Sequence, residues 1–223
     1  MTDADALLST IDGVVADLVR PFDAVAVAYS GGLDSSIVAA LAKKRVRVRC
    51  YCACAPSSYD EANAGSFASD DGLEISTIII TDQDIVELVQ LAKEIHPGTG
   101  PVSASYTIPT LCVIKRASEV GILSGGVADE LFAGYAKYES SDDLAGAMTI
   151  DLEKALSEAK MLQGYSAKVH KEFLVPYASE SVMEAASDIP VDSKIGPEGR
   201  KLILRECARR LGLSAADRPK KAA

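Results

Sequence analysis

The sequence predicts an α/β fold, in which a doubly wound, mostly parallel sheet is followed by a helical C-terminal subregion. Strand-like apolar segments alternate with segments of helical spacing up to about residue 140, and a glycine-rich turn joins the first of these strands to a helix. Parallel strands need helical crossovers of this length, and right-handed crossovers place helices on both faces of a sheet. We therefore expect an open sheet of at least four strands.

The composition fits one globular domain over residues 1–223, with an α/β core in residues 1–140 and a helical part in residues 141–223. The chain is 48% hydrophobic and 25% charged, and it is long enough to bury a full core. Its net charge of −9 gives no general attraction to phosphate backbones or anionic membranes. Neither nucleic acid nor a membrane is therefore expected as a partner.

The sequence indicates a cytoplasmic protein. No apolar run approaches the length of a membrane span, and the apolar residues near the N-terminus have helical spacing instead of forming a signal-peptide core. The five cysteines, an odd number without a secretory signal, indicate a reducing compartment. Cys50, Cys52 and Cys54 continue one apolar strand face and are spaced too far apart to chelate one ion, so we interpret them as core residues.

Each element follows from a local pattern. Residues 1–20 have the apolar spacing of a helix. Residues 23–30 form a short apolar strand, residues 31–44 an amphipathic helix that ends in lysines and residues 45–54 a second strand, which together make a βαβ unit. The alternation continues through a helix, a strand, two helices and a strand at residues 57–72, 73–80, 82–95, 109–120 and 121–124.

Helix starts are marked by residues that favour the first turn. Ser57 or Ser58 caps one helix, Thr81 or Asp82 caps the next, and Pro109 is suited to open the helix before the fourth strand. The remainder of the chain predicts helices with no strand between them, at residues 152–163, 179–189 and 199–212.

The turn "AYSGGLDSS" has the chemistry of an anion cradle. A glycine-rich loop between a strand and a helix surrounds an anion with backbone N–H groups, and the hydroxyls of Ser30, Ser35 and Ser36 add donors. The spacing matches neither a Walker loop nor a dinucleotide-binding loop. Asp34 would repel a phosphate unless a hard cation such as Mg²⁺ lay between them. The turn therefore predicts a phosphate site with a magnesium ligand.

This turn resembles the pyrophosphate-binding loop of the N-type ATP pyrophosphatases, whose members cut ATP between the α and β phosphates. The resemblance implies an adenine nucleotide alpha hydrolase-like fold with ATP and Mg²⁺ as cofactors. It also implies that the loop holds the leaving pyrophosphate through Ser30, Gly31, Gly32, Leu33, Asp34, Ser35 and Ser36.

A second motif, "LSGGVADELFAGY", follows the fourth strand. Ligands of open α/β sheets bind at the carboxyl ends of the strands, so this loop should face the first one across a crevice. Asp34 and Asp129 then suggest a metal clamp on ATP, which leaves Glu130 for the substrate. The alternative is that both acids only favour the start of a helix.

The second motif resembles the S-G-x-G-A-D-E-L-F-G-G-Y signature of asparagine synthetase and β-lactam synthetase. Carried over, this resemblance implies that Ser124 and Gly125 touch ATP, that Asp129 binds Mg²⁺ and that Glu130 lines the acceptor site. By the same resemblance, Tyr29 and Ala53 fall where the family contacts the adenosine part of ATP.

The segment "EGRKLILRECARRLGLSAADRPKK" resembles the closing segment of that family, an Arg-rich helix followed by R-x-K. Lys220 falls by its spacing on the lysine that stabilises charge during adenylation, with Lys221 as the second choice. The alternative is a solvated basic tail. His96 precedes Pro97 in a loop and His170 lies in a helical region; because neither has a partner motif, we interpret both as structural or surface residues.

The chain departs from the family pattern in three places. Val127 and Ala133 replace glycines of the signature, and because a β-branched residue disfavours positive φ, we expect a differently shaped substrate loop. The chain begins Met1-Thr2 where asparagine synthetase has the N-terminal cysteine of its glutaminase domain. We therefore expect a stand-alone synthetase domain that makes no ammonia from glutamine.

The resemblance implies an ATP-dependent carbon–nitrogen ligase that forms AMP and pyrophosphate and acts in asparagine biosynthesis. Aspartate is the family's default acceptor, and free ammonia, an amine or a separate glutaminase subunit would supply the nitrogen. Two alternatives stay open: a tRNA-modifying ATP pyrophosphatase and a non-catalytic nucleotide-binding protein. The oligomeric state is open as well, a homo-oligomer included.

Overall fold

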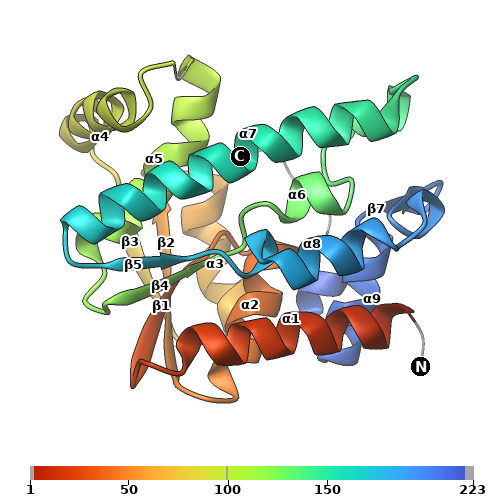
Figure 1. Ribbon diagram of the computed structural model, residues 1–223. Helices are drawn as coiled ribbons and strands as arrows, with labels where there is room; N and C mark the ends of the chain where they lie inside the picture. Colours follow the sequence, from red (N-terminus) through yellow and green to blue (C-terminus); the bar gives the residue numbers. More distant parts are fainter. Residues whose placement is uncertain (1–2, 99, 219–223) are drawn as a thin grey trace.

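The computed structural model describes residues 3–98 and 100–218, of which residues 101–104 are described by their backbone only. A five-stranded sheet in the order β3-β2-β1-β4-β5 forms its centre (Figure 1). Every neighbouring pair in this sheet is parallel. The strands are β1 (Ala24–Ala28), β2 (Arg47–Cys54), β3 (Ile75–Ile79), β4 (Gly121–Ser124) and β5 (Glu172–Leu174). The predicted parallel α/β sheet is therefore confirmed.

Helices cover both faces of the sheet. They are α1 (Asp3–Val19), α2 (Leu33–Lys43), α3 (Tyr59–Asp70), α4 (Asp82–Ile95), α5 (Pro101–Arg116), α6 (Ala128–Leu131), α7 (Leu144–Lys168), α8 (Glu180–Ser187) and α9 (Leu202–Arg210). Helix α1 packs against α2, α8 and α9 on one side, while α4 packs against α5 and α7 on the other (Figure 1). A small antiparallel hairpin, β6 (Ile195–Gly196) and β7 (Gly199–Arg200), precedes α9.

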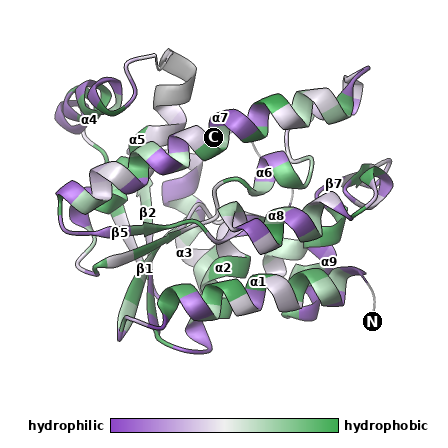
Figure 2. Ribbon diagram, viewed as in Figure 1, coloured by the Kyte–Doolittle hydropathy of each residue, from purple (hydrophilic) through white to green (hydrophobic). Residues whose placement is uncertain are grey.

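The apolar pattern explains this layering. The central strand β1 reads AVAVA and is buried along its middle residues, as expected of a parallel strand with helices on both faces. Helix α1 buries Leu7, Ile11 and Val15, which lie four residues apart on one stripe. Figure 2 shows the result, with hydrophobic strands inside and hydrophilic residues on the outer sides of the helices.

Two predicted caps and the cysteine interpretation agree with the structure. Ser58 caps α3, since its side chain accepts a hydrogen bond from the Glu61 N–H. Thr81 caps α4 in a reciprocal capping box with Asp84. The three strand cysteines discussed above are free and buried.

Two expectations about the helices and strands are wrong. Helix α5 begins at Pro101 instead of Pro109, which lies inside the helix. The expectation of no strand after residue 140 fails at β5, which joins the main sheet beside β4, and again at the small hairpin. Strand β5 has three residues, which is too short to show a period in the sequence.

Among the described residues, no helix is both long and apolar enough to cross a membrane.

Candidate active site

The candidate site lies where the strand order reverses. Strand β1 pairs with β2 on one side and with β4 on the other, so the loops that follow β1 and β4 leave the sheet at the switch point. These loops touch: a Cβ added to Gly125 would lie 2.8 Å from the Ser35 backbone nitrogen and 3.0 Å from the Asp34 carbonyl carbon. The expected meeting of the two loops is therefore confirmed.

The first loop is held by its own hydroxyls. The Ser35 Oγ donates to the Gly32 carbonyl at 3.2 Å and accepts from the Ser30 N–H at 3.3 Å. Gly31 has a φ of +70°, and an added Cβ there would lie 2.8 Å from the Phe67 ring. Gly32 caps α2 without a side-chain hydrogen bond. The loop thus presents the N-terminus of an 11-residue helix towards the crevice, as an anion site requires.

The two predicted metal ligands converge on a lysine. The Lys201 Nζ lies 2.5 Å from an Asp34 carboxylate oxygen and 2.7 Å from an Asp129 carboxylate oxygen. Burial alone would lower the pKa of Lys201, but the charges of Asp34 and Asp129 outweigh it and hold that pKa above its ordinary value. Lys201 is therefore a buried ammonium shared by two carboxylates.

Sequence reasoning missed Lys201. It precedes α9 with a left-handed backbone, φ +57°, and Gly134 makes room for it, because a Cβ there would overlap Lys201 Cε and an Asp129 oxygen. A lysine just before a helix gives no distinctive signal in the sequence, because lysine is common on helix surfaces.

The carboxylates fit the predicted magnesium ion by their chemistry. Asp34 and Asp129 lie close enough to share one cation, as their common contact with the Lys201 Nζ shows, and Mg²⁺ is commonly held by one or two carboxylates together with phosphate oxygens. Within residues 3–98 and 100–218, no cluster of three or more His, Cys, Asp or Glu side chains could hold an ion by itself. Magnesium at this pair stays a prediction, and phosphate oxygens would complete its coordination.

A pocket of about 180 Å³ adjoins the second loop, lined by residues of that loop and of α5, α7 and β5. Glu130 lies in it, 7% exposed, and accepts a hydrogen bond from the Tyr135 hydroxyl at 2.5 Å. Burial raises the pKa of Glu130, which the Tyr135 hydrogen bond partly offsets. Glu130 therefore lines a pocket beside the second loop, and its contact with an acceptor stays a prediction.

The other predicted nucleotide contacts lie at the same edge of the sheet. Tyr29 is buried, and its hydroxyl accepts a hydrogen bond from the Ser36 hydroxyl at 3.4 Å. Ala53 is buried at the end of β2, next to β1. The Ser124 Oγ accepts from the Gly126 N–H at 3.1 Å and shapes the second loop. Their contact with ATP stays a prediction.

Arg218 ties the C-terminal segment to the first loop. Its guanidinium donates to the Gly31 carbonyl at 3.0 Å, pairs with Asp71 at 3.2 Å and lies 4.3 Å from the centre of the Phe67 ring. In the sequence this arginine is the first residue of the R-x-K pattern, which predicts no role for it. The predicted catalytic Lys220, like Lys221, lies outside the described residues.

The expectation that Val127 avoids positive φ is wrong, while a loop shape different from that of the family stays a prediction. Val127 and Ala133 both adopt left-handed backbone, with φ of +75° and +53°. A left-handed residue other than glycine costs about 1–2 kcal/mol. Both side chains are buried, so the surrounding packing holds this geometry.

The contact between the two loops yields a first prediction. Gly125→Ala should lower the free energy of unfolding by about 1–3 kcal/mol, because the new methyl group meets backbone that cannot rotate away. Gly126→Ala is the matched control, since its Cβ would lie 3.4 Å from the Ser124 hydroxyl, an ordinary contact. Urea unfolding of both variants measures the difference; equal stabilities would show that the loops do not touch in solution.

Comparison with known proteins identifies relatives. The asparagine synthase family model matches residues 6–168. A curated relative from Methanocaldococcus jannaschii, "Putative asparagine synthetase (glutamine-hydrolyzing) 1", is 31% identical over 194 residues, which cover 79% of this chain and 35% of that protein. The chain thus spans about a third of the length of this relative.

Solved structures with a similar arrangement share little sequence with the chain. A predicted subunit of tRNA methyltransferase from Methanocaldococcus jannaschii is 16% identical with a TM-score of 0.42, covering 87% of this chain and 90% of that one. An NH3-dependent NAD synthetase from Campylobacter jejuni is 14% identical with a TM-score of 0.39, covering 100% of both chains. The family match extends over most of the α/β core and includes both site loops, and the chain belongs to the asparagine synthase family.

Proposed function

We propose that the protein is an ATP-dependent amide ligase that adenylates a carboxylate and releases pyrophosphate. The observation that carries this proposal is the meeting of Asp34, Asp129 and Lys201 at the contact between the two loops. The N-terminus of α2, which is suited to an anion, and the pocket of about 180 Å³ both adjoin this charged cluster. Phosphate and acid would therefore meet beside it.

The reaction would proceed in two displacements. A carboxylate oxygen of the substrate attacks the α-phosphorus of ATP, the bond from this phosphorus to the bridging oxygen breaks, and pyrophosphate leaves into the Ser30–Ser36 loop. The nitrogen of ammonia or an amine then attacks the acyl carbon, and AMP leaves. Each step moves negative charge onto phosphate oxygens, where fixed positive groups lower the barrier.

Several groups of this chain would supply that positive charge. Lys201 is held in place by two carboxylates before substrate arrives, so its orientation costs little at the moment of reaction. Asp34 and Asp129 would hold Mg²⁺, which supplies charge neutralisation on the phosphates when it is bound. Arg218 fixes the backbone of the first loop through the Gly31 carbonyl.

Glu130 is suited to take the proton that the attacking nitrogen loses. It lines the pocket beside the second loop, and burial raises its pKa towards the range in which a carboxylate is an effective base. The Tyr135 hydroxyl would keep the carboxylate oriented.

The identities of the acid and of the nitrogen source are also proposed. Aspartate is the acceptor that the family suggests, and the nitrogen would come from ammonia, an amine or a separate glutaminase subunit. We propose that residues 1–223 act as one synthetase domain, because Lys201 reaches Asp34 across 167 positions of the chain and β5 extends the main sheet.

A screen for product formation tests the proposal. The protein is mixed with ATP, Mg²⁺ and single carboxylic acids, with ammonia as nitrogen donor, and the nucleotide and phosphate products are separated. We expect AMP and pyrophosphate in equal amounts with at least one acid. ADP and inorganic phosphate as products would indicate a different reaction. In a parallel mixture that contains tRNA, modification of the tRNA would indicate a tRNA-modifying ATP pyrophosphatase.

Lys220 provides a second test of the chemistry. Lys220→Ala should lower the rate of adenylation much more than it weakens ATP binding, because a lysine that meets the developing phosphate charge acts mainly in the transition state. Single-turnover rates and the ATP dissociation constant are measured on the same variant. If only ATP binding weakens, Lys220 is a ground-state contact; if neither changes, the segment is a solvated tail.

A further inference from the structure

Among the described residues, the charged side chains that line the pocket beside the second loop are all acidic. Its charged side chains in the described part of the chain are Asp129, Glu130 and Glu158, and no Lys, Arg or His of that part lines it. The Lys201 ammonium, which pairs with Asp129, is shared with Asp34. Among the residues that the structure describes, the side chains that line this pocket therefore carry more negative than positive charge.

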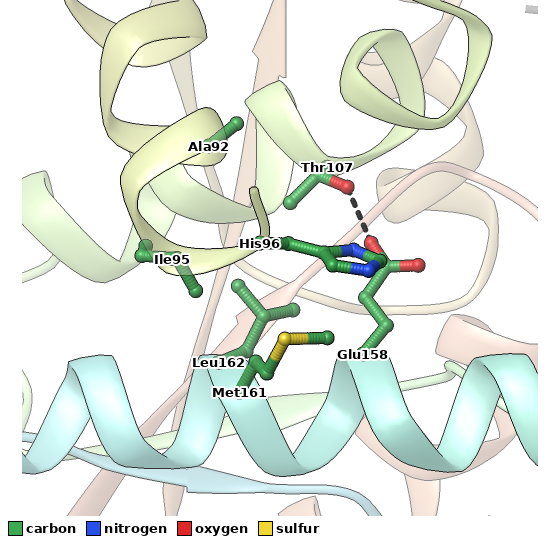
Figure 3. Close-up of a pocket in the computed structure, with 7 residues that line it drawn as sticks. All are labelled: Ala92, Ile95, His96, Thr107, Glu158, Met161 and Leu162. Atoms are coloured by element: carbon green, nitrogen blue, oxygen red, sulfur yellow. Dashed lines mark hydrogen bonds between the residues drawn. The ribbon is translucent and has the colours of Figure 1, made fainter. Parts of the chain in front are cut away.

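Glu158 lies at the boundary between this pocket and a smaller one. The smaller pocket is enclosed by α4, α5 and α7, and Figure 3 shows Glu158 projecting from α7 into it beside the side chains of Thr107 and His96. The Thr107 hydroxyl donates a hydrogen bond to the carboxylate. None of the second-loop residues lines the smaller pocket. Glu158 is thus an oriented carboxylate where the pocket beside the second loop adjoins the smaller one.

The remaining lining suits a short aliphatic body. It includes Ala155, Ala159, Leu162, Phe173 and Val175. A ligand that reached from the second loop along this wall towards Glu158 would have its acyl group near Asp129 and its far end near a carboxylate. A second carboxylate at that far end would face the like charge of Glu158, and no described Lys, Arg or His lines this pocket to pair with it, since His96 lines the smaller pocket on the other side of Glu158.

We propose that the ligand of this pocket carries a primary ammonium group and no second carboxylate, and that Glu158 recognises the ammonium. The proposal departs from aspartate, the family's default acceptor. It rests on the proposed function for the reaction, but the binding preference itself does not need turnover. The ammonium belongs either to the acid that is adenylated or to the amine that attacks it, and the experiment separates these two sources.

Calorimetric titration without ATP tests the preference directly. The probes are 4-aminobutyrate, pentanoate and glutarate, which share a chain and end in ammonium, methyl and carboxylate, together with butylamine, aspartate and homologues one methylene shorter and longer. We expect the ammonium ligands to bind at least tenfold more tightly than the matched methyl and carboxylate ligands. Binding of the amino acid alone assigns the ammonium to the acid substrate, and binding of butylamine as well assigns it to the attacking amine.

A matched pair of variants assigns the preference to Glu158. Glu158→Gln keeps an oxygen for the Thr107 hydroxyl but removes the charge, and should weaken the ammonium ligands about ten- to a hundredfold while leaving pentanoate unchanged. Glu153→Gln, exposed on the same helix, should leave all affinities unchanged, and circular dichroism confirms that both variants fold.

Three results would overturn the proposal. They are binding of glutarate or aspartate as tight as that of 4-aminobutyrate, no binding of 4-aminobutyrate, its homologues or butylamine, and equal effects of the Glu158 and Glu153 variants. A failed ligase assay with the expected binding series would instead contradict the proposed reaction alone.

Discussion

Replacing Asp34 or Asp129 by asparagine is expected to lower the rate of pyrophosphate formation at least a hundredfold, with the chain still folded. Each change removes one of the two carboxylates that hold Lys201 and that would hold Mg²⁺, and loss of a single preorganised charge contact commonly has this effect on a rate. Pyrophosphate release at saturating ATP and Mg²⁺ measures it. Asp192→Asn, at an exposed position, is the control.

One result would contradict the proposed role of Asp34 and Asp129 in the reaction. If either variant releases pyrophosphate at the full rate, the pair is only a structural ion pair with Lys201. Thermal unfolding of the same samples separates a loss of activity from a loss of fold.

Lys201→Met is expected to have the largest effect on stability, a loss of about 3 kcal/mol of unfolding free energy. The substitution removes the ammonium that the two carboxylates share, and removing one member of a buried ion pair is costly. Asp34 and Asp129 are 18% and 24% exposed, which places the cost at the lower end of the range for buried pairs. Urea unfolding with and without MgCl2 measures it.

Magnesium distinguishes this account from simple loss of packing. In the absence of ATP, Mg²⁺ should stabilise Lys201→Met more than the unaltered protein, because the cation replaces the missing ammonium between the carboxylates. Lys194→Met is the control. Lys194 is also buried, but its pKa is lowered by burial, whereas the pKa of Lys201 is raised. It should be neutral or stabilising. Equal effects of the two lysines would contradict the proposed cluster.

The parts of the fold that were predicted correctly carry short-range signals. Strand, glycine-rich loop and helix follow one another directly at residues 24–43, and the caps at Ser58 and Thr81 bond within four residues. The second loop repeats this arrangement after β4. The position of both loops at one edge then follows from parallel pairing, so most of the candidate site was accessible from the sequence.

The groups that sequence reasoning missed reach the site through tertiary packing. Lys201 meets Asp34 across 167 positions, and Arg218 meets Gly31 across 187. Lys201 stands just before the Arg-rich helix without a pattern of its own, and the R-x-K pattern that includes Arg218 does not indicate its contact with the first loop. Glu158 was missed for the same reason, since its helix, α7, reads as an ordinary amphipathic segment. Strand β5 is recruited by β4 and has too few residues to show its own pattern.

In the proposed reaction, a carboxylate oxygen of the acid attacks the α-phosphorus of ATP at the contact between the two loops. The most direct measurement uses an acid substrate labelled with ¹⁸O in its carboxylate, followed by mass analysis of the nucleotide product. The account predicts AMP that carries one ¹⁸O atom, since the attacking oxygen stays on phosphorus when nitrogen displaces AMP from the acyl carbon. Unlabelled AMP, or label in inorganic phosphate released with ADP, would contradict it.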